Sequence, residues 1–176
     1  MDMNWDAIGA IAEVIGAAAV LGSLLYLANQ IRQGTEVARS VARQGIAETA
    51  IAELSSVVEN AELAELLFRK ISGEDVEDHE DYRLRLFAFR SFRLYENAHF
   101  QYWNGLLQRD EWLAFRSNLS LLFELDFYNH CWEVLRPQFT PIFRQLVEDI
   151  SQDLEERGRL GAAGAEIIGL GKRESG

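Results

Sequence analysis

Glu96 and His99 form the only Glu-x-x-His motif in this chain of 176 residues. On a helix these two side chains share one face, as they do in the carboxylate-bridged di-metal sites of helical bundles. Such sites need a second motif and further carboxylates, and neither His79 nor His130 has a glutamate three residues before it. We therefore expect a structural histidine, with Glu96 and His99 as weak candidates for a metal site. We expect no cofactor.

The same segment places polar residues in an unusually aromatic stretch. Aromatic side chains fall on several faces of the helix expected from the acidic stretch 74–81 to Asn104, so we expect that helix to be central and covered on most sides. Its polar residues must then be fully hydrogen-bonded. Arg93 and Glu96 are three residues apart and can pair. We predict a buried polar network that fixes the packing, and a ligand or partner site is the alternative. The network comprises Arg90, Arg93, Glu96 and Asn97.

Two other candidate motifs do not support catalysis. His130 and Cys131 are adjacent, so on a helix their side chains point about 100° apart and do not form a nucleophile–base pair. The segment 169–172 ends in Gly-Lys, but Glu166 stands where a phosphate-binding loop needs its first glycine. We therefore predict a protein that is not an enzyme.

Residues 7–27 are apolar, with one charge at Glu13 in 21 residues. As a helix this run is about 30 Å long, which matches the hydrocarbon core of a bilayer. We predict a transmembrane anchor over residues 1–31. A cleaved signal peptide and a buried core helix of a soluble protein are the alternatives.

The flanks of the run favour the anchor and set its direction. Trp5 and Tyr26 lie near its two ends, where aromatic rings meet the membrane interface. Arg32, Arg39 and Arg43 follow the run, and no basic residue precedes it. The positive-inside rule then places the N-terminus outside and the rest of the chain in the cytoplasm, as a single-pass protein of a bacterial inner membrane.

Small residues follow one side of the anchor at alternating spacings of three and four. We call these residues the seam, and they are Gly9, Ala12, Gly16, Ala19 and Ser23. Small side chains let two helices approach closely, so we expect homo-oligomers that pack through the seam. The alternative is that small residues are simply common in membrane helices. Glu13 lies beside the seam. In an oligomer its carboxylate either lines a pore or binds a polar partner; alternatively it snorkels to the interface between membrane and water.

The net charge limits which classes of molecule can be partners of this chain. The net charge is −11, with 28 acidic and 17 basic residues. Nucleic acid is therefore an unexpected partner, because nucleic-acid affinity comes largely from basic groups that neutralise phosphates. The lipid bilayer and a second copy of the chain are the expected partners, and a further protein partner is left open.

Helical periodicity continues after the anchor. One face of the continuing helix carries Val37, Val41, Ala47, Ile51, Leu54 and Val58, with Gly34 and Gly45 as weak points. Start and stop signals divide the rest into five further helices, the last running to about Arg157. These signals are Asn60, Gly73, Asn104–Gly105, Asp110, Asp126 and Thr140–Pro141. We predict an all-α fold with a cytoplasmic helical domain over residues 32–157 and a flexible glycine-rich tail over 158–176.

Several stretches resemble a widespread family of uncharacterised bacterial membrane-anchored proteins. They are residues 5–8, 12–16, 24–28, 30–33, 92–98 and 105–107, Trp112, and residues 139–141. The resemblance covers everything except the tail. It implies one transmembrane helix followed by one helical domain, and it implies no activity.

Overall fold

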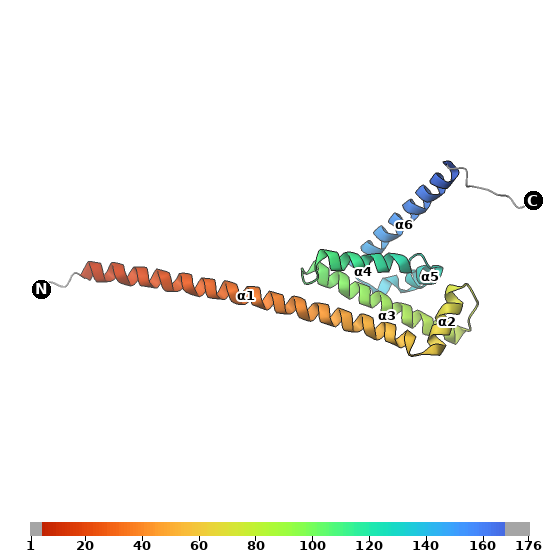
Figure 1. Ribbon diagram of the computed structural model, residues 1–176, viewed down its shortest axis with the longest axis horizontal. Coiled ribbons are helices and arrows are strands. Elements are labelled where there is room, and N and C mark those ends of the chain that lie inside the picture. Colours follow the sequence, from red (N-terminus) through yellow and green to blue (C-terminus); the bar gives the residue numbers. More distant parts are fainter. Residues whose placement is uncertain (1–4, 168–176) are drawn as a thin grey trace, which may run out of the picture.

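The computed structural model describes residues 5–167, with side chains at residue 9 and over residues 13–158. Within these residues the chain is all-α, with six α-helices, one short 3₁₀-helix and no strand, as the sequence predicts. Figure 1 shows one long helix that projects from a group of shorter ones.

Helix α1 (Trp5–Val58) is a single helix of 54 residues, about 80 Å long. It passes Gly34 and Gly45 without a break, although glycine lowers helix stability. Its first hydrogen bond to the helical domain is at Arg39, whose Nε donates to the carbonyl oxygen of Gly105 at 3.1 Å. A stalk of about 18 Å therefore separates the end of the apolar run from that contact.

The sequence signals around the next two helices are confirmed. Helix α2 (Ala61–Ile71) begins where the Asn60 side chain accepts a hydrogen bond from the Leu63 amide at 3.0 Å. Gly73 follows it with a φ of 83°, which suits glycine because it has no Cβ. Helix α3 (Asp78–Trp103) is capped by Asn104 and followed by Gly105, which also has a positive φ.

Two of the predicted N-caps are wrong by one or two residues. Helix α4 (Arg109–Leu122) is capped by Gln108, which forms a reciprocal capping box with Glu111, so Asp110 lies inside the first turn. Helix α5 (Asp126–Leu135) is capped by Leu125, and Asp126 is its first residue. Acidic residues in a first turn interact favourably with the helix dipole without capping the backbone.

The last helix is longer than the sequence suggests. A 3₁₀ turn (Arg136–Gln138) leads into α6 (Pro141–Ile167), where the Phe143 amide donates to Thr140 Oγ1 at 3.4 Å. The helix continues ten residues past Arg157, so the predicted flexible tail over 158–176 is wrong for 158–167, and its remainder lies outside the described residues. Alanines among the glycines of this stretch favour the helix.

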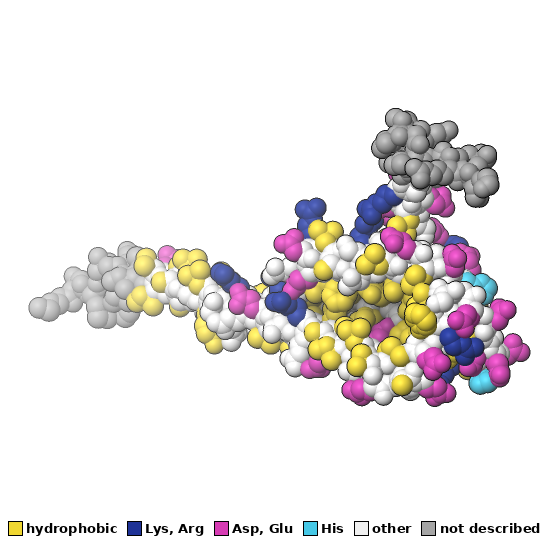
Figure 2. All heavy atoms as spheres, turned by 45° about the vertical axis from the view of Figure 1, so that its right-hand side comes forward, with side chains coloured by type: hydrophobic (Ala, Val, Ile, Leu, Met, Phe, Trp, Pro, Cys, Tyr) yellow, Lys and Arg dark blue, Asp and Glu magenta, His cyan; other side chains and the backbone are white. Residues whose placement is uncertain are grey.

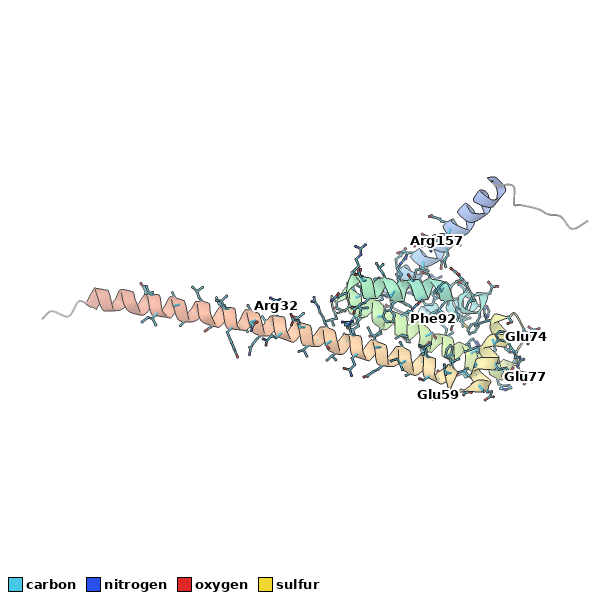
Figure 3. The ribbon with its side chains drawn as sticks, in the orientation of Figure 1. Arg32, Glu59, Glu74, Glu77, Phe92 and Arg157 are labelled. Carbon is cyan, nitrogen blue, oxygen red and sulfur yellow. The ribbon has the colours of Figure 1, made fainter. Side chains whose placement is uncertain are left out.

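The aromatic core surrounds Phe92 of α3. Its ring lies 5.3–6.0 Å, centroid to centroid, from the rings of Phe123, Tyr128, Trp132 and Phe139. Figure 3 places Phe92 within the group of short helices and Arg32 on the part of α1 that projects from it. Helix α3 contacts α1, α2, α4 and α5, so its predicted central position is confirmed. Its cover is incomplete, because Tyr82, Phe100 and Trp103 are exposed.

A second cluster joins α1 to the domain. Ile46 is the one buried hydrophobic residue of α1 among its described side chains, and it belongs to a cluster with Leu94, Ala98, Leu107 and Trp112. The apolar face that periodicity indicates on this part of α1 is, by contrast, not covered by the domain. Its large apolar residues are all exposed, and they are Val37, Val41, Ile51, Leu54 and Val58.

Candidate functional site

Arg93 and Glu96 form the predicted ion pair, and together they fasten the start of α6 to α3. Glu96 accepts hydrogen bonds from the Arg93 guanidinium and, at 2.8 Å, from the Thr140 amide. Arg93 Nη2 also donates to the carbonyl oxygen of Gln138 at 2.9 Å. The guanidinium carbon lies 4.7 Å from the ring centroid of Phe139. The pair therefore holds the turn between α5 and α6, which is a structural role.

The prediction of one buried network of four residues is wrong. The Glu96 side chain is 12% exposed, whereas that of Arg93 is 44% exposed. Arg90 and Asn97 are exposed, and Arg90 points elsewhere, to Ser56 Oγ of α1 at 2.8 Å. The four residues lie within about 120° of one side of α3, but that side passes from α1, where Arg90 binds Ser56, to the start of α6, where Glu96 binds Thr140.

A buried polar contact that the sequence analysis missed lies between α1 and α3. Glu53 of α1 accepts a hydrogen bond from the Ser91 hydroxyl. Burial raises the pKa of Tyr95 and of Tyr128 to about 12, and the charge of Glu53 adds to both shifts. Glu53 lies seven residues after Ile46, which is the spacing of one helix face, and this spacing is the signal that could have identified it.

His99 is a packed histidine. Its ring stacks on Trp112 with 4.9 Å between centroids. Burial lowers the pKa of His99, and the neighbouring Glu96 carboxylate opposes that shift. The Glu96 oxygens already accept from Arg93 and Thr140, and the described residues contain no group of three or more His, Cys, Asp or Glu side chains that could hold a metal. These contacts give no support to a metal site at Glu96 and His99.

Cys131 is buried, and its pKa is raised to about 11 by that burial. A thiol must ionise to act as a nucleophile or ligand, so this cysteine is unreactive at neutral pH. His130 is exposed, so the two adjacent residues face different surroundings, as their spacing predicts.

An apolar groove lies between the C-terminal half of α3 and the start of α6. It has a volume of about 500 Å³, and a neighbouring hollow of about 280 Å³ shares three of its residues. The exposed side chains of Phe100, Trp103 and Ile142 line it beside Arg93 and Glu96. The ion pair thus forms one wall of a hydrophobic surface. Figure 2 shows hydrophobic side chains gathered in a hollow of the helical domain and along the described part of α1.

The seam lies on a part of α1 that contacts nothing else in the described chain. An 18-residue window of this helix has a mean hydropathy of 1.7, and none of the window is buried. The helix is therefore long and apolar enough to span a membrane, and it is not the buried core helix of this domain. A Cβ added at Gly9, Gly16 or Gly22 would meet no atom within 4 Å. Nothing described in the chain itself requires small residues there. Glu13 is exposed beside the seam.

Comparisons with protein-family models, with curated proteins and with solved structures found no match for this chain.

Proposed function

We propose that this chain is a non-catalytic, membrane-anchored helical module that associates with further copies of itself through the seam of α1. The observation that carries the proposal is the exposure of the seam residues whose side chains the structure describes, Gly9, Gly16, Ala19 and Ser23, and the two glycines have no neighbour in their own chain. Glycine inside a helix costs about 1 kcal/mol relative to alanine. Close contact with another transmembrane helix is a physical reason to retain it.

The anchor spans the bacterial inner membrane once, with the N-terminus outside and the helical domain in the cytoplasm. Arg32, Arg39 and Arg43 support this direction. Arg39 and Arg43 also contact the domain, Arg43 through Glu111 at 2.5 Å, so the positive charges lie close to where the stalk meets the helical bundle. The stalk holds the domain at a short, fixed distance from the bilayer.

The native mass of the full-length protein, extracted from membranes in mild detergent, tests the proposal. We expect a discrete oligomer for the natural chain and a smaller species for Gly16→Ile, because the added side chain separates the helices. Ala17→Ile is the matched control, since it adds bulk one residue away on a side of the helix that faces lipid. A monomeric natural chain, or equal effects of the two variants, contradicts the proposal. Recovery in the soluble fraction without detergent removes the anchor itself.

Glu13 separates this proposal from an oligomeric pore or conductance regulator. It follows Ala12 directly and is exposed beside the seam, so an oligomer brings several such carboxylates near one axis. If the protein is a non-catalytic module without a pore, Glu13→Gln should leave both assembly and membrane permeability unchanged. Altered ion flux through vesicles that contain the Glu13→Gln protein would favour the pore.

A further inference from the structure

The part of α1 beyond the seam has an uncharged side, apolar toward Val58, that the helical domain does not cover. Positions at alternating spacings of three and four define this side, which we call the outer stripe. All of its residues are exposed, and they are Gln33, Val37, Ser40, Gln44, Ala47, Ile51, Leu54 and Val58.

The outer stripe continues the seam in the same register. After Ser23 the alternation passes through Tyr26 and Gln30 and reaches Gln33 without a skipped or added residue. Helix α1 is unbroken over this distance, so the backbone transmits the register from the seam to Val58. The repeat of 3.5 residues is free of charge over seven heptads, with small residues in the seam and apolar ones at Val37 and from Ala47 to Val58. Such a repeat is the pattern of a left-handed coiled coil.

Charged residues are excluded from the outer stripe although they are common around it. None of those between residues 32 and 59 occupies one of its positions, and they are Arg32, Glu36, Arg39, Arg43, Glu48, Glu53 and Glu59. A solvated helix face has no need to exclude charge, whereas the seam between two helices does.

The domain packs on a different side of α1. The residues that face it recur with the same alternation, and they are Arg39, Arg43, Ile46, Ala50, Glu53 and Val57. By helical geometry this side lies about 100° around the axis from the outer stripe. A helix on the outer stripe therefore displaces nothing that the domain contributes.

We infer that a second copy of this chain covers the outer stripe, and that the two α1 helices form one parallel coiled coil from the membrane to Val58. This inference rests on the proposed self-association and extends it beyond the bilayer. Copies anchored in the same membrane have the same direction, so their α1 helices are parallel. Gln30, Gln33 and Gln44 then meet their own counterparts, and like amides satisfy each other because each both donates and accepts.

The size of the contact is sufficient for a stable dimer. Standard-size interfaces use about 20–30 residues from each partner. The seam, the linking residues Tyr26 and Gln30, and the outer stripe together have fifteen positions, from Gly9 to Val58. The flanking residue after every second position brings each copy into that range. A twofold axis along the helices places the two domains on opposite sides of the pair, because each lies about 100° from the shared contact.

Disulfide cross-linking of the full-length protein in its membrane tests the inference. Ile51→Cys lies on the outer stripe, and Thr49→Cys lies two residues away on an exposed side that faces neither the partner nor the domain. Ala19→Cys reports on the seam inside the bilayer. The buried Cys131 stays in place, and the natural chain serves as the blank. The readout is the dimer fraction on a non-reducing gel after a mild, membrane-permeable oxidant.

We expect Ile51→Cys to form several-fold more dimer than Thr49→Cys, with Ala19→Cys also cross-linking. If Ala19→Cys cross-links and Ile51→Cys does no better than Thr49→Cys, the coiled coil ends at the membrane, so the inference is wrong while the proposed self-association stands. If none of the three exceeds the natural chain, both are wrong.

Discussion

Ile46 and Ile51 are the same residue type five positions apart on α1, yet Ile46 is 2% exposed and Ile51 is 62% exposed. Helix α3 repeats the contrast, since Phe92 is fully buried and Trp103 is 68% exposed. The buried member of each pair packs in a hydrophobic cluster of the helical domain, whereas Ile51 points away from the domain and Trp103 lines its open groove. Residues of equal hydrophobicity therefore differ in role: Ile46 and Phe92 hold the chain together, whereas Ile51 and Trp103 stay exposed in the single chain.

Phe92→Ala should have the largest effect, because it removes the ring at the centre of the aromatic core. We expect a loss of about 3–5 kcal/mol in the free energy of unfolding. Trp103→Ala should cost far less, about 0.5 kcal/mol or under, because an exposed side chain loses little packing. Denaturation of the full-length protein in detergent, followed by circular dichroism, measures both. Equal losses would show that Trp103 is covered and would remove the contrast within α3.

Ile46→Ala and Ile51→Ala test the contrast within α1 with the same chemical change. Ile46→Ala leaves a cavity between α1 and α3 and should cost about 2–5 kcal/mol. Ile51→Ala should leave the melting of the domain unchanged within about 0.5 kcal/mol. Its effect should fall on the dimer fraction at low protein concentration. A domain that melts earlier in Ile51→Ala than in Ile46→Ala would reverse the assignment of the two faces.

Glu96→Gln should lower the free energy of unfolding by an intermediate amount, because it weakens the junction of α3 and α6. The amide keeps an oxygen for the Thr140 amide but loses the charge that pairs with Arg93. We expect a loss of about 1–2 kcal/mol, toward the low end for hydrogen bonds to charged groups, because Arg93 is partly exposed to solvent. Glu133→Gln, at an exposed glutamate of α5, is the control. If Glu96→Gln is as stable as the natural chain, the pair of Arg93 and Glu96 does not fasten α6 to α3.

The pH dependence at His99 should be the smallest effect. Burial lowers the pKa of His99 in the folded state below the value of about 6.5 expected in the unfolded chain. The unfolded chain then binds more protons as the pH falls, so the folded state loses stability below about pH 6.5. We expect the natural chain to lose more stability between pH 7.5 and 5.5 than His99→Gln does. Equal losses would mean that His99 titrates as it does in water.

Local signals in the sequence located most of the helix boundaries. Asn60, Gly73, Asn104–Gly105 and Thr140–Pro141 lie where the chain starts or stops a helix, because capping and positive φ depend on one or two residues. Asp110 and Asp126 were placed wrongly as caps because an acidic residue is equally favourable inside the first turn.

The candidate site was harder to predict from the sequence than the helix boundaries were. The pairing of Arg93 with Glu96 follows from their spacing of three, but Thr140 and Gln138, which complete the fastening, lie more than 40 residues away. The Glu53–Ser91 contact likewise joins residues 38 positions apart. No local pattern specifies such partners, since they depend on how the helices pack.

The sequence by itself determined that this chain is all helical, begins with a long helix that is apolar in its first half, and carries uncharged residues in one continuous register along that helix. These properties depend on the composition and spacing of neighbouring residues. Only the tertiary structure decided that the domain packs against Ile46 and Glu53 and leaves Ile51 and Val58 uncovered. The covered face carries Arg39, Arg43 and Glu53 and is the less apolar of the two, so hydropathy alone does not select it. The partners that α3 and α4 offer, which depend on tertiary packing, decide which face is covered.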